Sequence, residues 1–455
     1  IATGNGDGTV LINGAFDAGG RIGITTGENR DIVTVSGAGS LSADQQIEIA
    51  TGAGADDVTL TGDVTAGGLI DIATGEGVGI IGITGDLDAG GQIAITMGDD
   101  RDDLTLDGDM TAIGLIDIAT GNGDGTVLIN GAFDAGGRIG ITTGDDHDVV
   151  SITSQLSAGG DIEFNTAGER DYVTVTGGLT SATAINVLTG DDKDTVVMSG
   201  LTLSAPLMRI DGQADDDFIQ VYENIVATGA LTLAGGTGSD RIEVVRLASH
   251  TAGDSLTIDG GDDADDLMIQ TWGSTTGAAA GIDYRITIAS ASDITPANGV
   301  DTLDVLGTDS DDDVFLSRAN FAALLHGTEA QVIGTEAGRP TTVERIDYDR
   351  SLNGRLTLAG LDGNDVFISD DNGTIMTMDG GLGDDRFQFG QIFGSEPIAG
   401  GTYDDGNGIV SNGIAAGDDI ATIQTTRGYL SNGASFAVTA FGGEGADRFT
   451  VYANR

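Results

Sequence analysis

A perfect internal repeat constrains this chain more than any other feature. The segment from Ile1 to Gly27 recurs without a change from Ile118 to Gly144, an offset of 117 residues. A shorter unit, most often 23 residues long, lies inside that offset. Its copies begin at Ile1, Ile24, Ile49, Ile72, Ile95, Ile118, Ile141, Phe164, Val187, Ile210, Leu233 and Ile258. We therefore expect successive copies of one small structural unit.

The unit has the pattern of short, half-buried β-strands. Apolar residues alternate with polar ones over short runs, and glycines interrupt the runs, which is typical of strands joined by tight turns. The apolar tenth position is held by Val10, Val33, Val58, Ile81, Leu104, Val127, Val150, Val173, Val196 and Ile219. So small a unit cannot bury a core alone, so each strand must pair with its equivalent in the next copy. The sequence predicts an all-β, right-handed parallel β-helix (β-solenoid) with about 23 residues and three strands per coil.

The spacing becomes irregular near Ile258. We expect a regular solenoid over residues 1–257 and a continuing solenoid with irregular coils, inserted loops and further glycine turns over residues 258–455. Insertions are expected at Thr271–Asp283, Arg318–Glu344 and Gln391–Gly433. The stretch "RANFAALL", which begins at Arg318, is expected to form one or two helical turns.

The charge of the chain limits its partners. It has 72 acidic and 19 basic residues, and its formal net charge is -53. Such a chain repels nucleic acid and anionic membranes and attracts cations. It has no cysteine, which excludes thiolate metal sites, and no apolar run long enough to span a bilayer. The chain begins in mid-pattern without a signal-peptide-like stretch, so we expect a segment or a processed form of a longer protein.

An aspartate column runs through the repeats at the eighth position of the unit. It comprises Asp31, Asp56, Asp102, Asp148, Asp171, Asp194, Asp217, Asp240 and Asp265, and it continues at Asp312, Asp365, Asp385 and Asp447. Stacking brings such carboxylates about 4.8 Å apart, where two charges repel by roughly 1 kcal/mol in water and by several at lower dielectric. Carboxylates and turn carbonyls in a flexible cage suit Ca²⁺ better than Mg²⁺, which demands a strict octahedron. We therefore expect several Ca²⁺ ions along the column.

Several glycine turns resemble a known calcium motif. "GGTGSD" (Gly235–Asp240), "GGDDAD" (Gly260–Asp265), "GGLGDD" (Gly380–Asp385) and "GGEGAD" (Gly442–Asp447) are similar to the nonapeptide GGxGxDxUx of the repeats-in-toxin (hemolysin-type) family of secreted bacterial proteins. The resemblance implies a β-roll that folds outside the cell, with Ca²⁺ held between successive turns by aspartate side chains and loop carbonyls. Only one such turn occurs per 23-residue coil, so ions are expected along one edge. Other corners, such as "AGGRI", resemble large secreted β-helix adhesins.

The column and the resemblance together predict the metal-site residues. They are Asp31, Asp56, Asp102, Asp148, Asp171, Asp194, Asp217, Gly235, Gly236, Gly238, Asp240, Gly260, Asp265, Asp312, Gly360, Gly363, Asp365, Gly380, Gly383, Asp385, Gly442, Gly445 and Asp447. The column lapses at Gly8, Gly79 and Gly125. A salt-adapted surface without ion sites predicts scattered acidic residues, so the fixed spacing favours specific sites.

Five turns place a basic residue directly before the aspartate. These residues are Arg30, Arg101, His147, Arg170 and Lys193. Two interpretations are open: the basic side chain neutralises the column in place of an ion, or it points into solvent, where exposed ion pairs contribute little.

Catalysis has little support in this sequence, because the three histidines are far apart and paired carboxylates are too common to be informative. We interpret the chain as a non-enzymatic segment of a secreted or surface-attached bacterial repeat protein, stabilised by Ca²⁺ and structural or adhesive in role. We expect it to associate head-to-tail or laterally into filaments. Two alternatives stay open: a module that binds a glycan or receptor, and a polysaccharide lyase or epimerase with its site in the loops after Ile258.

Overall fold

The structure is a computed structural model. It describes residues 1–200, 202–222, 226–245, 249–250, 256–271, 284–289, 299–309, 314–318, 321–326, 342–348, 351–394 and 422–452. Two compact units are distinguished, the first comprising Ile1–Ile219 and Ala227–Ala230 and the second comprising Gln220–Val226 and Leu231–Arg455. The strands β27 (Phe218–Tyr222) and β28 (Val226–Thr237) each contain residues of both units.

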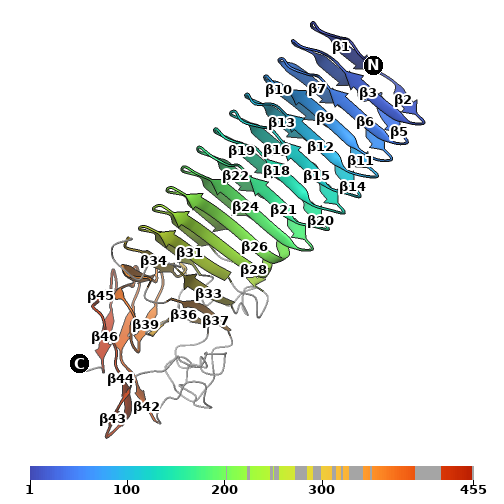
Figure 1. Cartoon of the computed structure of the whole chain (residues 1–455). Coiled ribbons are helices and arrows are strands. Elements are labelled where there is room, and N and C mark those ends of the chain that lie inside the picture. The colour runs from blue at the N-terminus through green and yellow to red at the C-terminus, as the bar shows by residue number, and fades with distance from the viewer. Residues whose placement is uncertain are drawn as a thin grey trace. The chain divides into compact units, whose positions relative to one another are not determined.

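The first unit is a stack of coils, each with three short strands that pair in parallel with their equivalents in the neighbouring coils (Figure 1). The first strands of the coils are β1 (Thr9–Ile12), β4 (Ile32–Val35), β7 (Asp56–Leu60), β10 (Gly79–Ile83), β13 (Asp103–Leu106), β16 (Thr126–Ile129), β19 (Val149–Ile152), β22 (Tyr172–Val175) and β25 (Thr195–Ser199). The second strands are β2 (Ala15–Ala18), β5 (Ser40–Ala43), β8 (Val64–Ala66), β11 (Leu87–Ala89), β14 (Met110–Ala112), β17 (Phe133–Ala135), β20 (Leu156–Ala158) and β23 (Leu179–Ser181). The third strands are β3 (Arg21–Thr25), β6 (Gln46–Ala50), β9 (Ile70–Gly75), β12 (Ile93–Met97), β15 (Ile116–Ala119), β18 (Ile139–Thr142), β21 (Ile162–Asn165) and β24 (Ala184–Gly190), and β26 (Thr202–Ala214) pairs with both β23 and β24.

The core of the first unit consists of stacked aliphatic side chains. Val33 pairs in register with Val10 on one side and with Val58 on the other, and all three are buried. The same inward position is buried in every following coil of this unit, so apolar area is removed from water along the whole stack. The predicted parallel β-solenoid with about 23 residues per coil is confirmed.

The second unit continues with parallel pairing and adds antiparallel hairpins. One parallel sheet orders β29 (Arg241–Val245), β32 (Asp266–Gln270), β34 (Thr302–Leu306), β38 (Arg355–Ala359), β40 (Ile375–Asp379) and β45 (Val438–Phe441). A second parallel series joins β35 (Val314–Arg318), β39 (Val366–Ser369), β41 (Arg386–Phe389) and β46 (Arg448–Val451), and another joins β31 (Leu256–Asp262), β33 (Tyr284–Ala289) and β37 (Thr342–Asp347). The remaining strands are β30 (Ser249–His250), β36 (Phe321–His326), β42 (Ile392–Phe393), β43 (Thr422–Thr425) and β44 (Gly428–Ser431).

One expectation about the second unit is wrong. The described residues of "RANFAALL" are strands instead of a helix: Arg318 ends β35, and the residues from Phe321 onward lie in β36, which pairs antiparallel with β35 on one edge and β37 on the other. Two flanking strands satisfy its backbone groups, which outweighs the helix propensity of alanine and leucine. None of the described residues lies in a helix, so none of them belongs to a helix that could cross a membrane.

Aromatic stacking holds the second parallel series together. Phe315, Phe367, Phe387 and Phe449 follow one another on β35, β39, β41 and β46. Their ring centroids are 4.9, 4.9 and 4.6 Å apart, with nearly parallel planes. This ladder replaces the aliphatic column of the first unit and fixes the same coil-to-coil register.

Candidate functional site

The predicted aspartates of the first unit form a buried ladder. Each stands at or directly before the first residue of a first-column strand, as Asp31 does before β4 and Asp171 before β22. Asp31, Asp102, Asp148 and Asp171 are 0% exposed. The turn and the strand register together place these carboxylates inside the corner of the coil, one above another.

A backbone amide separates each ladder carboxylate from the next. The Oδ1 atom of Asp171 accepts the N–H of Asp148 at 2.7 Å, and Oδ1 of Asp194 accepts the N–H of Asp171 at 2.8 Å. The Asp31 N–H donates in the same way to Oδ1 of Asp56, at 2.9 Å. Each rung is thus held by a hydrogen bond from a backbone N–H to a carboxyl oxygen, and this bond is stronger when the carboxyl group is ionised.

A column of threonines accompanies the ladder. The third position of the coil holds Thr26, Thr51, Thr74, Thr120, Thr143, Thr166 and Thr189, and all are buried. Thr166 and Thr189 donate from Oγ1 to the carbonyl of the next coil, each at 3.1 Å. Their hydroxyls also face Asp171 and Asp194 and lower the pKa of these carboxyls. The sequence analysis assigned this column no role, although its period equals that of the aspartates.

Burial makes the ladder costly to ionise. Desolvation, with a smaller contribution from the neighbouring carboxylates of Asp194 and Asp148, raises the pKa of Asp171 to about 8. Desolvation likewise raises the pKa of Asp102 to about 7 and the pKa values of Asp148 and Asp194 to about 6. Near neutral pH the ladder therefore needs a counter-charge, and either a proton or a cation can supply it.

The second unit has an aspartate ladder whose residues directly precede the strands β29, β32 and β34. The Asp240 N–H donates to Oδ1 of Asp265 at 3.0 Å, and the Asp265 N–H donates to Oδ1 of Asp301 at 3.1 Å. Asp301 is buried, and sequence reasoning missed it because "NGVD" lacks the glycine pattern of the other turns. Its position one residue before an apolar alternation is the signal that identifies it. The next rung is an asparagine, since the Asp301 N–H donates to Oδ1 of Asn353 at 3.2 Å.

A separate aspartate ladder in the second unit directly precedes strands of the second parallel series. Asp365, Asp385 and Asp447 precede β39, β41 and β46, with N–H to Oδ1 distances of 2.8 and 3.1 Å between successive rungs. The expectation of carboxylates along one edge only is therefore wrong for this unit. In this unit, glycine turns precede strands of both parallel sheets, so aspartates lie at two corners of the coil. Asp312 lies outside the described residues.

The predicted turn glycines of the second unit make room for the carboxylates. A Cβ atom at Gly235, Gly260, Gly360, Gly380 or Gly442 would lie only 2.0–2.1 Å from Oδ2 of the aspartate of the same turn. The next glycines approach the preceding coil: Gly383 has a φ of 133°, and a Cβ there would lie 1.5 Å from the carbonyl oxygen of Gly363. Gly236, Gly238, Gly363 and Gly445 also have positive φ. Glycine is thus required where the carboxylate folds over its own turn and where coils approach most closely.

Some oxygen atoms of the ladders are suited to binding a hard cation such as Ca²⁺, but no complete ligand set is present. The Oδ2 atoms of Asp265 and Asp385 are buried and have no hydrogen-bond partner. Oxygen donors around such atoms are the chemistry that Ca²⁺ prefers. Among the described residues, however, no group of three or more histidine, aspartate or glutamate side chains is placed to hold a metal ion. Any ion must therefore use carbonyl or hydroxyl oxygens beside one or two carboxylates.

The basic turn residues lie on the surface. Arg30, Arg101, His147, Arg170 and Lys193 are exposed. Lys193 pairs with the exposed Asp216 of the next coil, and within residues 1–200 no ion pair joins Arg30, Arg101 or Arg170 to a carboxylate. His147 alone acts on the ladder, since its charge lowers the pKa of Asp148. The geometry favours the interpretation that these side chains point into solvent.

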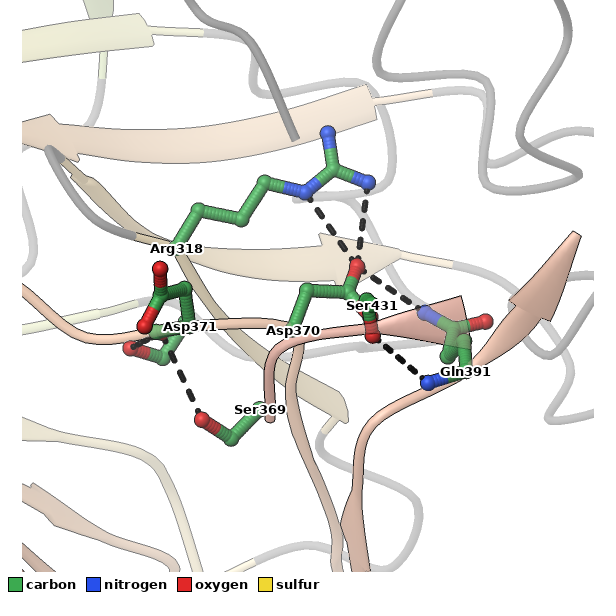
Figure 2. A network of polar contacts seen from close by, with 7 residues as sticks. Arg318, Ser369, Asp370, Asp371, Gln391 and Ser431 are labelled. Atoms are coloured by element: carbon green, nitrogen blue, oxygen red, sulfur yellow. Dashed lines mark hydrogen bonds and ion pairs between the residues drawn. The ribbon is translucent and has the colours of Figure 1, made fainter. Parts of the chain in front are cut away.

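A second buried polar cluster fixes the hairpin of the second unit (Figure 2). Oδ2 of Asp370 accepts hydrogen bonds from Nε and Nη2 of Arg318, at 3.3 and 3.2 Å, and from Nε2 of Gln391 at 3.1 Å. Oδ1 of Asp370 accepts the hydroxyl of Ser431 at 3.1 Å. Protein donors thus engage both carboxylate oxygens. We assign this cluster to the fold, because it joins β35, β39 and β44 and the segment before β42.

Comparisons with protein-family models, with curated proteins and with solved structures find no match. The resemblance to the nonapeptide repeats therefore rests on the glycine turns themselves.

Proposed function

We propose that this chain is a segment of an extracellular structural β-solenoid that calcium stabilises. The observation that carries the proposal is the buried ladder, in which carboxylates recur at coil spacing and each accepts the backbone N–H of the preceding coil. A fold that needs ions for charge balance suits surroundings where Ca²⁺ is abundant. Metal binding and folding are then coupled, because the unfolded chain has no preformed site.

The turn glycines support Ca²⁺ over other cations. They allow carboxylate and carbonyl oxygens to approach one another without side chains between them. The distances in such a cage are free to vary, which Ca²⁺ tolerates and Mg²⁺ does not. The four turns that resemble the nonapeptide motif point to the same ion.

Lateral association is the second part of the proposal. On the first strands of the coils in the first unit, one outward-facing position forms a column of uncharged residues that pair from coil to coil. This column includes Thr34, Thr59, Thr105, Ser151 and Thr174. In a chain of net charge -53, like-charged copies approach at lower cost along an uncharged column than along a charged one. We propose a structural or adhesive role without catalysis, in which copies associate through this face.

A calcium titration followed by far-UV circular dichroism tests the proposal. We expect the β-sheet signal and the unfolding temperature to increase with Ca²⁺ and to respond much less to Mg²⁺. Removal of Ca²⁺ by a chelator should reverse the change. Equal folding and equal stability in chelator and in Ca²⁺ would reject calcium stabilisation while leaving the solenoid fold intact.

A further inference from the structure

Two glycines divide the aspartate ladder of the first unit into separate runs. Gly79 lies in register between Asp56 and Asp102, and Gly125 lies between Asp102 and Asp148. Asp102 therefore has no ladder carboxylate in either neighbouring coil. The nearest ones are two coils away, or about 9.6 Å at the usual strand spacing.

The longest run in the first unit fills four successive coils. Its members are Asp148, Asp171, Asp194 and Asp217. The N–H of each of the first three donates to Oδ1 of the next, at 2.7, 2.8 and 2.8 Å. Asp31 and Asp56 form a shorter run of the same kind, which ends where the Asp56 N–H donates to the carbonyl of Val78 instead. Adjacent carboxylates thus occur in two runs, and Asp102 belongs to neither.

The charges around the two kinds of rung differ accordingly. Burial is the main cause that raises the pKa of Asp171, and the carboxylates of Asp148 and Asp194 in the neighbouring coils add to it. Burial is also the main cause at Asp102, but there the additional carboxylates belong to its own coil. Repulsion between rungs therefore acts within the run and is absent at Asp102.

The second carboxylate oxygens of the run are placed to share a cation. Oδ2 of Asp171 and Oδ2 of Asp194 are buried and have no hydrogen-bond partner. The hydroxyls beside them, those of Thr166 and Thr189, donate to backbone carbonyls at 3.1 Å. Because Oδ1 makes the same bond in each rung, the Oδ2 atoms repeat at the coil spacing of about 4.8 Å. A cation midway between two of them lies about 2.4 Å from each, which is a Ca²⁺–oxygen distance.

Asp102 has neither of the groups that could share an ion with it. The glycines on both sides supply no second carboxylate, and Met97 replaces the threonine at the third position of its coil. Met97 is 4% exposed, and its Cε would lie 2.9 Å from a Cβ atom at Gly79. A methyl group thus occupies the space where the ladder would otherwise continue, and it offers no oxygen to a hard cation.

We propose that Ca²⁺ binds in the first unit between aspartates of successive coils, and that Asp102 is a rung without an ion. This inference rests on the proposed function, because it takes Ca²⁺ as the cation of the ladder. Each ion joins two carboxylates and removes the repulsion between them. The first unit then contains two separate calcium-binding blocks, one at Asp31 and Asp56 and one from Asp148 to Asp217.

A matched pair of substitutions tests the proposal in the full chain. Asp171→Asn and Asp102→Asn make the same chemical change, and both keep an oxygen that accepts the N–H of the preceding coil. Bound ions are counted by native mass spectrometry at limiting free Ca²⁺, with circular dichroism to verify folding. We expect Asp171→Asn to lose at least one ion and Asp102→Asn to lose none. Loss of an ion in Asp102→Asn, or no loss in Asp171→Asn, would overturn the proposal.

A variant that gains a rung gives a second measurement. Gly125→Asp supplies the missing carboxylate between Asp102 and Asp148, beside the hydroxyl of Thr120. The atom nearest to the added Cβ is Oδ1 of Asp148 at 2.8 Å, which is the end of a flexible side chain. The variant should bind at least one ion more than the wild type, and an unchanged count in the folded variant would also overturn the proposal. A wild type that binds no Ca²⁺ would reject the proposed function, and this inference with it.

Discussion

The two units differ in the groups that surround their buried ladder carboxylates. At most rungs of the first unit a threonine hydroxyl faces the ladder carboxylate, as Thr166 faces Asp171, whereas Met97 and Gly212 take this position before Asp102 and Asp217. In the second unit glycine takes that position, and the carboxylate of Asp385 lies directly over Gly380. A hydroxyl group offers a hydrogen bond to the carboxylate, whereas glycine offers only space.

This difference explains where the calcium-like motif occurs. In each of the four turns that resemble the nonapeptide, glycine replaces the threonine, at Gly235, Gly260, Gly380 and Gly442. Losing the hydroxyl removes a donor from the carboxylate, so the second unit depends more on an ion. We therefore expect the second unit to respond to Ca²⁺ at lower concentration and with a larger change in stability than the first.

The largest expected effect comes from filling the space over a turn glycine. In Gly380→Ala the added Cβ would lie 2.0 Å from Oδ2 of Asp385 and 2.7 Å from the carbonyl oxygen of Gly442. The carboxylate must leave its position, so we expect a loss of about 3 kcal/mol, measured by denaturant unfolding. The control is Thr166→Ala in the first unit, which removes one hydroxyl and should cost about 1 kcal/mol. Equal losses would contradict the distinction between the units.

The next effect is a loss of stability with rising pH in the absence of divalent cations. Burial raises the folded-state pKa of Asp171 to about 8 and that of Asp102 to about 7, from the ordinary aspartate value of 3.8. The folded chain therefore binds these protons more tightly than the unfolded chain does. Their stabilising contribution is complete below about pH 4 and is lost progressively as the pH rises from about 4 to 8. Thermal unfolding in chelator should show an unfolding temperature that falls over this range, and a flat or rising profile would count against a buried ladder.

A smaller effect is expected when one rung loses its charge but keeps its acceptor. In Asp171→Asn the side-chain oxygen still accepts the N–H of Asp148, so stability at low pH should change little. The pH dependence should become shallower, since the group with the pKa of about 8 is gone. Asp171→Ala removes the acceptor as well and should cost about 1–3 kcal/mol at every pH, because a buried N–H is left unpaired. If the two variants behave alike, the hydrogen bond between rungs has no energetic role.

The smallest effect is expected from the basic turn residues. In the double variant Arg101→Ala and Lys193→Ala, the calcium midpoint should not change, because both side chains are exposed and Lys193 pairs with an exposed aspartate. The measurement is a calcium titration monitored by circular dichroism. A clear increase in the calcium needed for folding would restore the interpretation that these residues replace an ion.

The solenoid and its ladder follow from the sequence because both are periodic. A repeat of 23 residues fixes which side chains stack, so the inward valines and the aspartates are predictable without coordinates. Asp301 and the second corner of the second unit were not predictable in this way. They depend on pairing partners separated by insertions, such as β32 with β34 and β41 with β46. Long-range pairing of this kind leaves no fixed spacing in the sequence.

The burial of the carboxylates and their hydrogen-bond partners could not be predicted from the sequence either. An acidic column at a glycine turn is equally consistent with exposed and with buried side chains. Only the coordinates show that Asp148 is 0% exposed and that a backbone N–H separates it from the next rung.

The central claim is that protons and cations are alternative counter-charges for the buried ladder. The most direct test is calorimetric titration of Ca²⁺ near pH 7 in buffers of different ionisation enthalpy, which counts the protons released per ion bound. Because the pKa of Asp171 is about 8, binding should release protons at pH 7, and the release should disappear near pH 9. Calcium binding without proton release at pH 7, or no binding at either pH, would contradict the account.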